Sequence, residues 1–176
     1  AVGNNLVNFG STNIFVTGQN GVLAQYDAGG VIRWISQPSG WVNYMTYKSG
    51  RIYAVMDGNE TNYIGGITNV SDRKFALSAL NATNGQAFWV RGVGSAEGEG
   101  NPLGVTDDIP AVSVSDTEVF LTGIAWGSNA SFGAYTVNWP SPNGQYLARY
   151  DTNGTAQLAV SFGGTNVWPW AAVADA

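Results

Sequence analysis

The sequence contains no cysteine and no histidine among its 176 residues. Without these side chains a protein cannot build a Ser-His-Asp triad, a cysteine nucleophile, a thiolate or imidazole metal site, or a disulfide. The two absences exclude most familiar hydrolase and oxidoreductase sites. We therefore expect a protein that is not an enzyme and that carries no cofactor.

Charge is also scarce, because only 11% of the residues are charged and the formal net charge is −5. No cluster of Lys and Arg could neutralise a run of phosphates, so nucleic acid is not an expected partner. No apolar run approaches the roughly 20 residues that a membrane-spanning helix needs. Two lysines beside many Asn, Ser, Thr and Gly residues are typical of an extracellular β-rich surface, and we expect an extracellular or cell-surface location.

Short runs rich in Val, Ile, Phe, Tyr and Trp, bounded by Gly, Asn, Asp or Ser, occur along the whole chain. They predict β-strands, as in NIFVTG, RIYAVMD, AFWVRGV, VFLTGIAW and YLARYD. No apolar pattern of helical period lasts three turns, and 24 scattered glycines disfavour helices. With 44% apolar residues, the chain predicts one all-β domain over residues 1–176.

The chain also repeats itself, in units of four predicted strands that we name A, B, C and D. The units cover about residues 5–37, 41–94 and 109–164, and a partial fourth unit over 165–176 contains WPWAAVADA. The best-preserved part is the turn between C and D: YDAGG from Tyr26, LNATNG from Leu80 and YDTNG from Tyr150. Asp or Asn bonds the backbone two residues on, and Gly supplies a positive φ, so these residues are predicted turn formers.

The repeat resembles known propeller families. GRIYAVMDG followed by FALSALNATNGQAFWV resembles the quinoprotein-type (PQQ-like) propeller repeat, and QYLARYDTNGTAQLAVSFGG followed by WPWAAVADA is similar to the bacterial SBBP propeller repeat. The resemblance implies antiparallel four-stranded blades in which an aromatic residue closes strand D. Trp34 and Trp89 occupy the closing position in the first two units, and Leu158 occupies it in the third. The resemblance reaches the scaffold repeat only, and it implies no quinone cofactor here.

Closed propellers have four to eight blades, whereas three units and a leftover strand are present here. An open array leaves an unpaired edge that invites pairing with another chain. Three explanations stay open: part of a longer propeller, copies that complete a ring, or copies that add into a filament. A β-sandwich is the alternative fold, because sandwiches use similar turns.

Two long insertions, residues 58–73 and 127–143, separate strands B and C in the later units. Long loops on a rigid scaffold often bind partners. Phe132, Tyr135 and Trp139 in the second insertion are candidates for an aromatic contact surface, together with Trp168 and Trp170 near the end of the chain. Alternatively, the second insertion forms its own hairpin and buries its rings, since FGAYTVNW alternates as a strand does.

Five Asn-X-Ser/Thr triplets are candidate glycosylation sites, and each lies in a predicted turn or insertion: Asn59, Asn69, Asn81, Asn129 and Asn153. Glu97, Glu99, Asp107 and Asp108 form the only concentrated negative charge, but their spacing matches no metal-binding loop, so no metal site is predicted.

Together these features favour a non-catalytic extracellular glycoprotein module that self-associates into a surface structure or filament through unpaired strand edges. Its expected partners are other copies of itself. The alternative is a propeller domain of a larger secreted protein that binds a carbohydrate or protein ligand through its long loops.

Overall fold

The computed structural model describes residues 5–10, 12–16, 21–57, 61–94, 110–140 and 143–162. These residues form sixteen β-strands and no helix, which confirms the all-β prediction. Hence no helix in these ranges is long and apolar enough to cross a membrane. The strands are β1 (Asn5–Phe9), β2 (Thr12–Val16), β3 (Leu23–Tyr26), β4 (Ile32–Ser36), β5 (Val42–Lys48), β6 (Arg51–Asp57), β7 (Thr61–Ile64), β8 (Ile67–Val70), β9 (Phe75–Asn81), β10 (Ala87–Gly94), β11 (Ala111–Val114), β12 (Glu118–Trp126), β13 (Asn129–Phe132), β14 (Tyr135–Asn138), β15 (Asn143–Asp151) and β16 (Ala156–Phe162).

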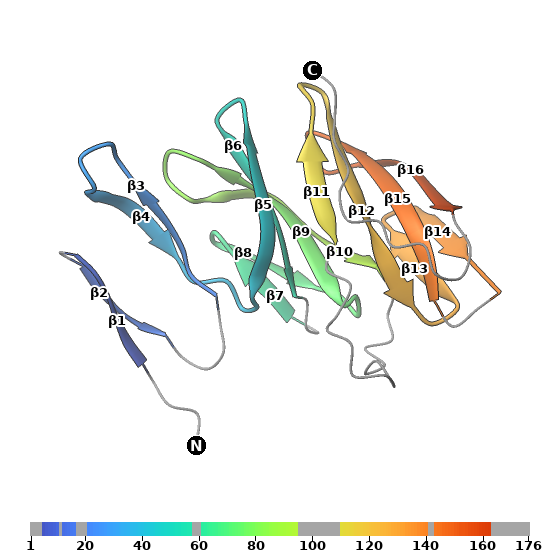
Figure 1. The fold of residues 1–176 in the computed structure, drawn as a ribbon, viewed down its shortest axis with the longest axis horizontal. Coiled ribbons are helices and arrows are strands. Elements are labelled where there is room, and N and C mark those ends of the chain that lie inside the picture. The colour runs from blue at the N-terminus through green and yellow to red at the C-terminus, as the bar shows by residue number, and fades with distance from the viewer. Residues whose placement is uncertain are drawn as a thin grey trace.

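All strand pairs are antiparallel, and they form five sheets. The central sheet has six strands in the order β14-β13-β10-β9-β6-β5, and a second sheet has the order β11-β12-β15-β16. The hairpins β1-β2, β3-β4 and β7-β8 are two-stranded sheets. Figure 1 shows β1-β2, β3-β4, the central sheet and the four-stranded sheet following one another in chain order along the longest axis of the molecule.

The second and third predicted units each have their four strands in the order of the chain. Strands β5, β6, β9 and β10 lie next to one another in the central sheet, and β11, β12, β15 and β16 make up the four-stranded sheet. Each insertion forms a hairpin, β7-β8 in the second unit and β13-β14 in the third. The predicted partial unit, residues 165–176, lies outside the described residues.

The first predicted unit, residues 5–37, is not one four-stranded sheet, because its strands form the separate hairpins β1-β2 and β3-β4. Leu6 and Phe15 of the first hairpin are 57% and 66% exposed. Asn8 and Asn13, which pair with each other on the same face, have low β-propensity. This face of the hairpin is exposed, whereas Val16 on the other face is buried. A two-stranded hairpin by itself is only marginally stable.

The core consists of two apolar layers, one on each face of the central sheet. Strands β6 and β9 are buried on both faces, which explains why RIYAVMD and FALSAL read as nearly continuous apolar runs. One layer joins β3, β4 and the β7-β8 hairpin to the central sheet: Leu23, Ala54, Met56, Ile64, Ala76, Leu80 and Val90, with Trp34 against them. The other joins the central sheet to the four-stranded sheet and includes Tyr53, Leu77, Trp89, Leu121, Phe132, Tyr146 and Tyr150.

Candidate functional site: the joints between sheets and the last strand

Successive units are held together by a tryptophan of strand D that packs on the C–D turn of the next unit. We call each such contact region between two units a joint. In the first joint, Trp34 of β4 donates its Nε1–H to the carbonyl of Ala82 at 2.9 Å. Its ring covers Gly85, where an added Cβ would come within 2.6 Å of the indole. Gly85 also has a φ of +72°, so glycine is needed both for the turn and for the close approach of the ring.

The second joint repeats this arrangement between the central sheet and the four-stranded sheet. Trp89 of β10 donates its Nε1–H to the carbonyl of Thr152 at 3.0 Å, and its ring covers Gly154, where an added Cβ would again lie 2.6 Å away. Arg91 adds a hydrogen bond from Nε to the carbonyl of Gly154 at 3.0 Å. The tryptophan that the sequence predicts at the closing position of strand D thus packs on the C–D turn of the following unit rather than within its own hairpin.

The insertion hairpins also contribute contacts at the joints. In the second joint, β13 pairs with β10, with Phe132 opposite Val93, and this pairing extends the central sheet to six strands. In the first joint, the amide of Ser39 donates to the carbonyl of Tyr63 in the β7-β8 hairpin at 2.9 Å. The amide of Tyr63 donates to Ser39 Oγ at 2.8 Å. The β13-β14 hairpin therefore links two units, and the β7-β8 hairpin bonds to Ser39 in the segment between the first two units.

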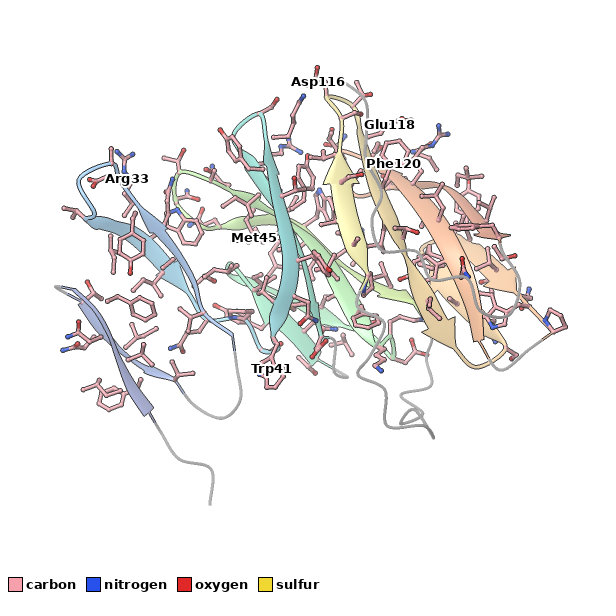
Figure 2. All side chains as sticks on the ribbon, in the orientation of Figure 1. Arg33, Trp41, Met45, Asp116, Glu118 and Phe120 are labelled. Atoms are coloured by element: carbon pink, nitrogen blue, oxygen red, sulfur yellow. The ribbon has the colours of Figure 1, made fainter. Side chains whose placement is uncertain are left out.

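One ion pair also crosses the second joint, near the tips of the A–B turns. Lys48 Nζ lies 3.1 Å from Asp116 Oδ1. Figure 2 shows Asp116 at the tip of the β11–β12 turn, close to the β5–β6 turn. Because the Asp116 side chain is 71% exposed, this pair adds little stability.

β16, the last strand of the described residues, differs from its counterpart β10, although both strands pair with strand C in the same register. Leu158, Val160 and Phe162 of β16 are 37%, 38% and 43% exposed. On β10, Trp89 stands at the position of Leu158 and Val93 at the position of Phe162, and these two residues are 5% and 0% exposed. Within the described ranges, β16 pairs with β15 alone, whereas β10 pairs with both β9 and β13. An apolar face and a strand edge are thus open on β16.

At the other end of the molecule, the first unit also presents apolar side chains to solvent. Tyr26 and Val31, beside the C–D turn, are 47% and 58% exposed. Figure 2 shows Arg33 of β4 at the outer side of the same hairpin. Gly30 of this turn has a φ of +78°, and an added Cβ would meet no described atom within 4 Å. The first C–D turn is therefore uncovered, unlike its two later counterparts.

A pocket of about 630 Å³ lies at the first joint. Its walls are the end of β4 and the following residues, the turn of the β7-β8 hairpin and the C–D turn of the second unit: Ile35, Ser36, Gln37, Tyr63, Gly65, Gly66, Ile67, Asn84, Gly85, Gln86 and Ala87. No charged side chain is among these residues. The lining combines one tyrosine ring with amide and hydroxyl groups.

The predicted aromatic surface of the second insertion does not form, because its three rings point to different surroundings. Phe132 is fully buried and packs against Tyr146, with ring centroids 4.6 Å apart. Trp139 donates to the carbonyl of Gly127 at 2.6 Å and packs against Gly144. Tyr135 is 37% exposed. Phe132 is therefore unavailable to a ligand. The second insertion forms the hairpin of the alternative, but it fully buries only Phe132 of its three rings. Trp168 and Trp170 lie outside the described residues.

The candidate glycosylation sites have unequal surroundings. Asn129 and Asn153 are exposed, on the β13-β14 hairpin and in the third C–D turn. Asn81 is half-buried, and its Oδ1 accepts a hydrogen bond from the amide of Thr83 at 2.8 Å. Asn69 is half-buried in β8, with its Oδ1 enclosed. Asn59 lies outside the described residues.

Tyr150, in the apolar layer of the second joint, has a raised pKa among the described residues. Burial raises the pKa of its hydroxyl above the ordinary value of about 10, and the nearby Arg91 opposes this rise. Among the described residues no group of three or more Asp or Glu side chains could hold a metal ion. The acidic residues Glu97, Glu99, Asp107 and Asp108 lie outside the described ranges.

Comparisons with protein-family models, with curated proteins and with solved structures find no match to this chain. The resemblance to propeller repeats therefore stays a prediction from the sequence.

Proposed function

We propose that this protein is a non-catalytic extracellular scaffold of propeller-type repeat units that self-associates through β16. The observation that carries the proposal is the contrast between β10 and β16. At equivalent positions of the repeat, β10 has its edge paired by β13 and its face buried, whereas the edge and the apolar face of β16 are open in the described structure. A neighbouring copy would cover the apolar face.

The composition of β16 supports this proposal. Its sequence, AQLAVSF, has no Lys, no Pro and no charge, which are the devices that usually protect an edge strand from pairing. Burial of Leu158, Val160 and Phe162 would gain about 25 cal/mol for each Å² of apolar surface removed from water. The first unit offers a matching apolar surface at the other end, so copies would join head to tail. Such contacts between unlike ends generate rings or filaments.

Light scattering over a range of protein concentrations tests the proposal. The wild-type chain should exceed the monomer mass of 18.5 kDa and grow with concentration, and electron microscopy should show rings or filaments. Phe162→Lys places a charge at the position equivalent to Val93, which is buried in the second joint, and should return the protein to monomers. Ser161→Lys is the matched control, because the neighbouring residue points to the other face of the strand and is also exposed. Equal masses for the two variants would contradict the proposed surface.

The extracellular location and glycosylation belong to the same proposal. The exposed Asn129 and Asn153 are the most accessible acceptors among the described sites. Intact mass spectrometry of the protein from its native source should show added hexose and hexosamine masses on these residues. An unmodified chain would remove glycosylation from the proposal without affecting self-association.

A second candidate function is carbohydrate binding in the pocket at the first joint. Its uncharged lining carries a partly exposed tyrosine ring, Tyr63, with the amides of Gln37, Asn84 and Gln86. A sugar ring could stack on the tyrosine while the amides bond its hydroxyls. A glycan array would identify a ligand, and Tyr63→Ala should abolish its binding. Tyr135→Ala, a comparably exposed tyrosine on the other insertion hairpin, should leave binding unchanged.

A further inference from the structure

We propose that the first C–D turn, Asp27 to Gly30, is an open socket that receives residue 158 of a neighbouring copy. The inference rests on the proposed self-association, since it names the contact that joins one copy to the next. The two internal joints serve as templates, because each shows which part of the turn receives the side chain from strand D.

The open turn already has the geometry of an occupied one. Asp27 Oδ1 accepts hydrogen bonds from the amides of Gly29 and Val31, both at 2.9 Å. In the third unit, Asp151 Oδ1 accepts from the amides at positions 153 and 155, also at 2.9 Å. The backbone bonds agree too, since the amide of Gly30 donates to the carbonyl of Asp27 at 3.0 Å, as Gly154 does to Asp151. The socket therefore needs no rearrangement to receive a side chain.

The turns differ in what covers their glycines. The indoles of Trp34 and Trp89 lie on Gly85 and Gly154, whereas no described atom lies within 4 Å of a Cβ built on Gly30. The two indoles donate to the carbonyl of the residue that follows the turn Asn or Asp. In the first unit this residue is Ala28, which is exposed. The uncovered turn thus offers both an apolar platform and a backbone acceptor.

The register of strand D identifies the residue that would fill the socket. Trp34 pairs with Gln25, Trp89 with Ala79 and Leu158 with Arg149, and each partner stands two residues before the Asp or Asn of its own turn. All three hairpins also have a register shift beside this pair. Leu158 is therefore presented to a following unit as the two tryptophans are.

Leucine fills this position only in part. It can cover Gly30 with apolar surface, but it has no N–H to donate to the carbonyl of Ala28. The first unit also has no insertion hairpin among its described residues to pair with the edge of a preceding strand D. The joint between copies is therefore weaker than the joints within the chain, so assembly is reversible while each copy stays folded.

Replacing Leu158 by tryptophan tests the socket, with association measured by analytical ultracentrifugation. Leu158→Trp should tighten association roughly tenfold, because one net hydrogen bond and a larger apolar area are gained. Gly30→Asn in the same chain should remove the gain, since asparagine tolerates the positive φ and its side chain occupies the socket. The matched controls are Ser161→Trp, at an exposed residue on the other face of β16, and Gly50→Asn, at a glycine with the same φ and open Cβ position.

The inference is overturned if Leu158→Trp associates no more tightly than Ser161→Trp, or if Gly30→Asn and Gly50→Asn have the same effect. A monomeric wild type with a Leu158→Trp variant that associates through Gly30 would support the socket and refute the proposed function. A wild type whose association changes with neither position 30 nor position 158 would support the proposed function and refute the socket. Leu158→Phe replaces the tryptophan variant if that variant does not fold, and it should give a smaller gain of the same sign.

Discussion

At the scale of single residues, the tryptophan–glycine pairs explain why the units hold together. Trp89, which is buried, and Trp34, which is half-buried, each combine a packed apolar ring with one hydrogen bond to a turn carbonyl of the next unit. An indole suits this position because it has a large apolar surface and a single donor. Only glycine fits beneath the ring, since any Cβ would collide with it.

Replacing Trp89 by phenylalanine should lower the free energy of unfolding by about 1–2 kcal/mol, because the hydrogen bond to Thr152 is lost and a cavity is left. Trp41→Phe is the control, since Trp41 is 51% exposed and stands outside both core layers. Its effect should stay within about 0.5 kcal/mol. Urea unfolding followed by circular dichroism measures both values, and equal losses would contradict the assigned role of Trp89.

Tyr150 predicts how stability depends on pH. Burial raises the pKa of the folded state above about 10, so the unfolded chain loses this proton first as the pH rises. Its contribution is therefore fully present below pH 10 and is lost progressively above it. Tyr150→Phe should show a shallower fall in the free energy of unfolding between pH 9 and about pH 11. Identical slopes for the variant and the wild type would count against a buried neutral hydroxyl.

At the scale of elements, the β13-β14 insertion hairpin connects two units. The β13-β14 hairpin belongs to the third unit by sequence, yet it pairs with β10 of the second. Phe132 fixes the hairpin from the inside, because its ring is fully buried in the layer between the two sheets.

Removing the Phe132 ring should therefore lower the free energy of unfolding more than removing the ring of Tyr135, its partner in the hairpin. Phe132→Ala should lower the free energy of unfolding by about 3–5 kcal/mol, as expected for a fully buried aromatic side chain. Tyr135→Ala, on the same hairpin but 37% exposed, should cost less than about 1 kcal/mol. Thermal unfolding of both variants checks the difference, and a similar loss in each would show that Phe132 does not anchor the hairpin.

The elements also show how far the sequence predicts this structure. Strands such as β6 and β9 and the turns at Asp27 and Asp151 follow from local signals, namely apolar runs and an Asp that bonds its own backbone. The joints could not be predicted in the same way, because Trp89 and Thr152 are 63 residues apart and no local rule relates them. The separation of β1-β2 from β3-β4 was missed for a similar reason, since it depends on burial by other sheets.

At the scale of the whole molecule, the described structure is a row of sheets with two dissimilar ends. Apolar layers fill the spaces between β3-β4, the central sheet and the four-stranded sheet. Further apolar side chains are exposed on β16 and on the first unit. Each internal layer requires a neighbour on both sides, as in other repeat proteins. We therefore interpret the two ends as surfaces that complete the same kind of layer between copies.

Cross-linking between copies tests this account most directly. The chain has no cysteine, so single cysteines can be placed at will: Ala28→Cys in one copy and Gln157→Cys in another leave Gly30 and Leu158 unchanged. A short bismaleimide should join the mixed copies, and mass spectrometry should identify the peptide pair that links positions 28 and 157. Thr117→Cys, exposed on the β11–β12 turn, should not be joined to position 28. Equal yields from positions 157 and 117, or no link between copies, would contradict the account.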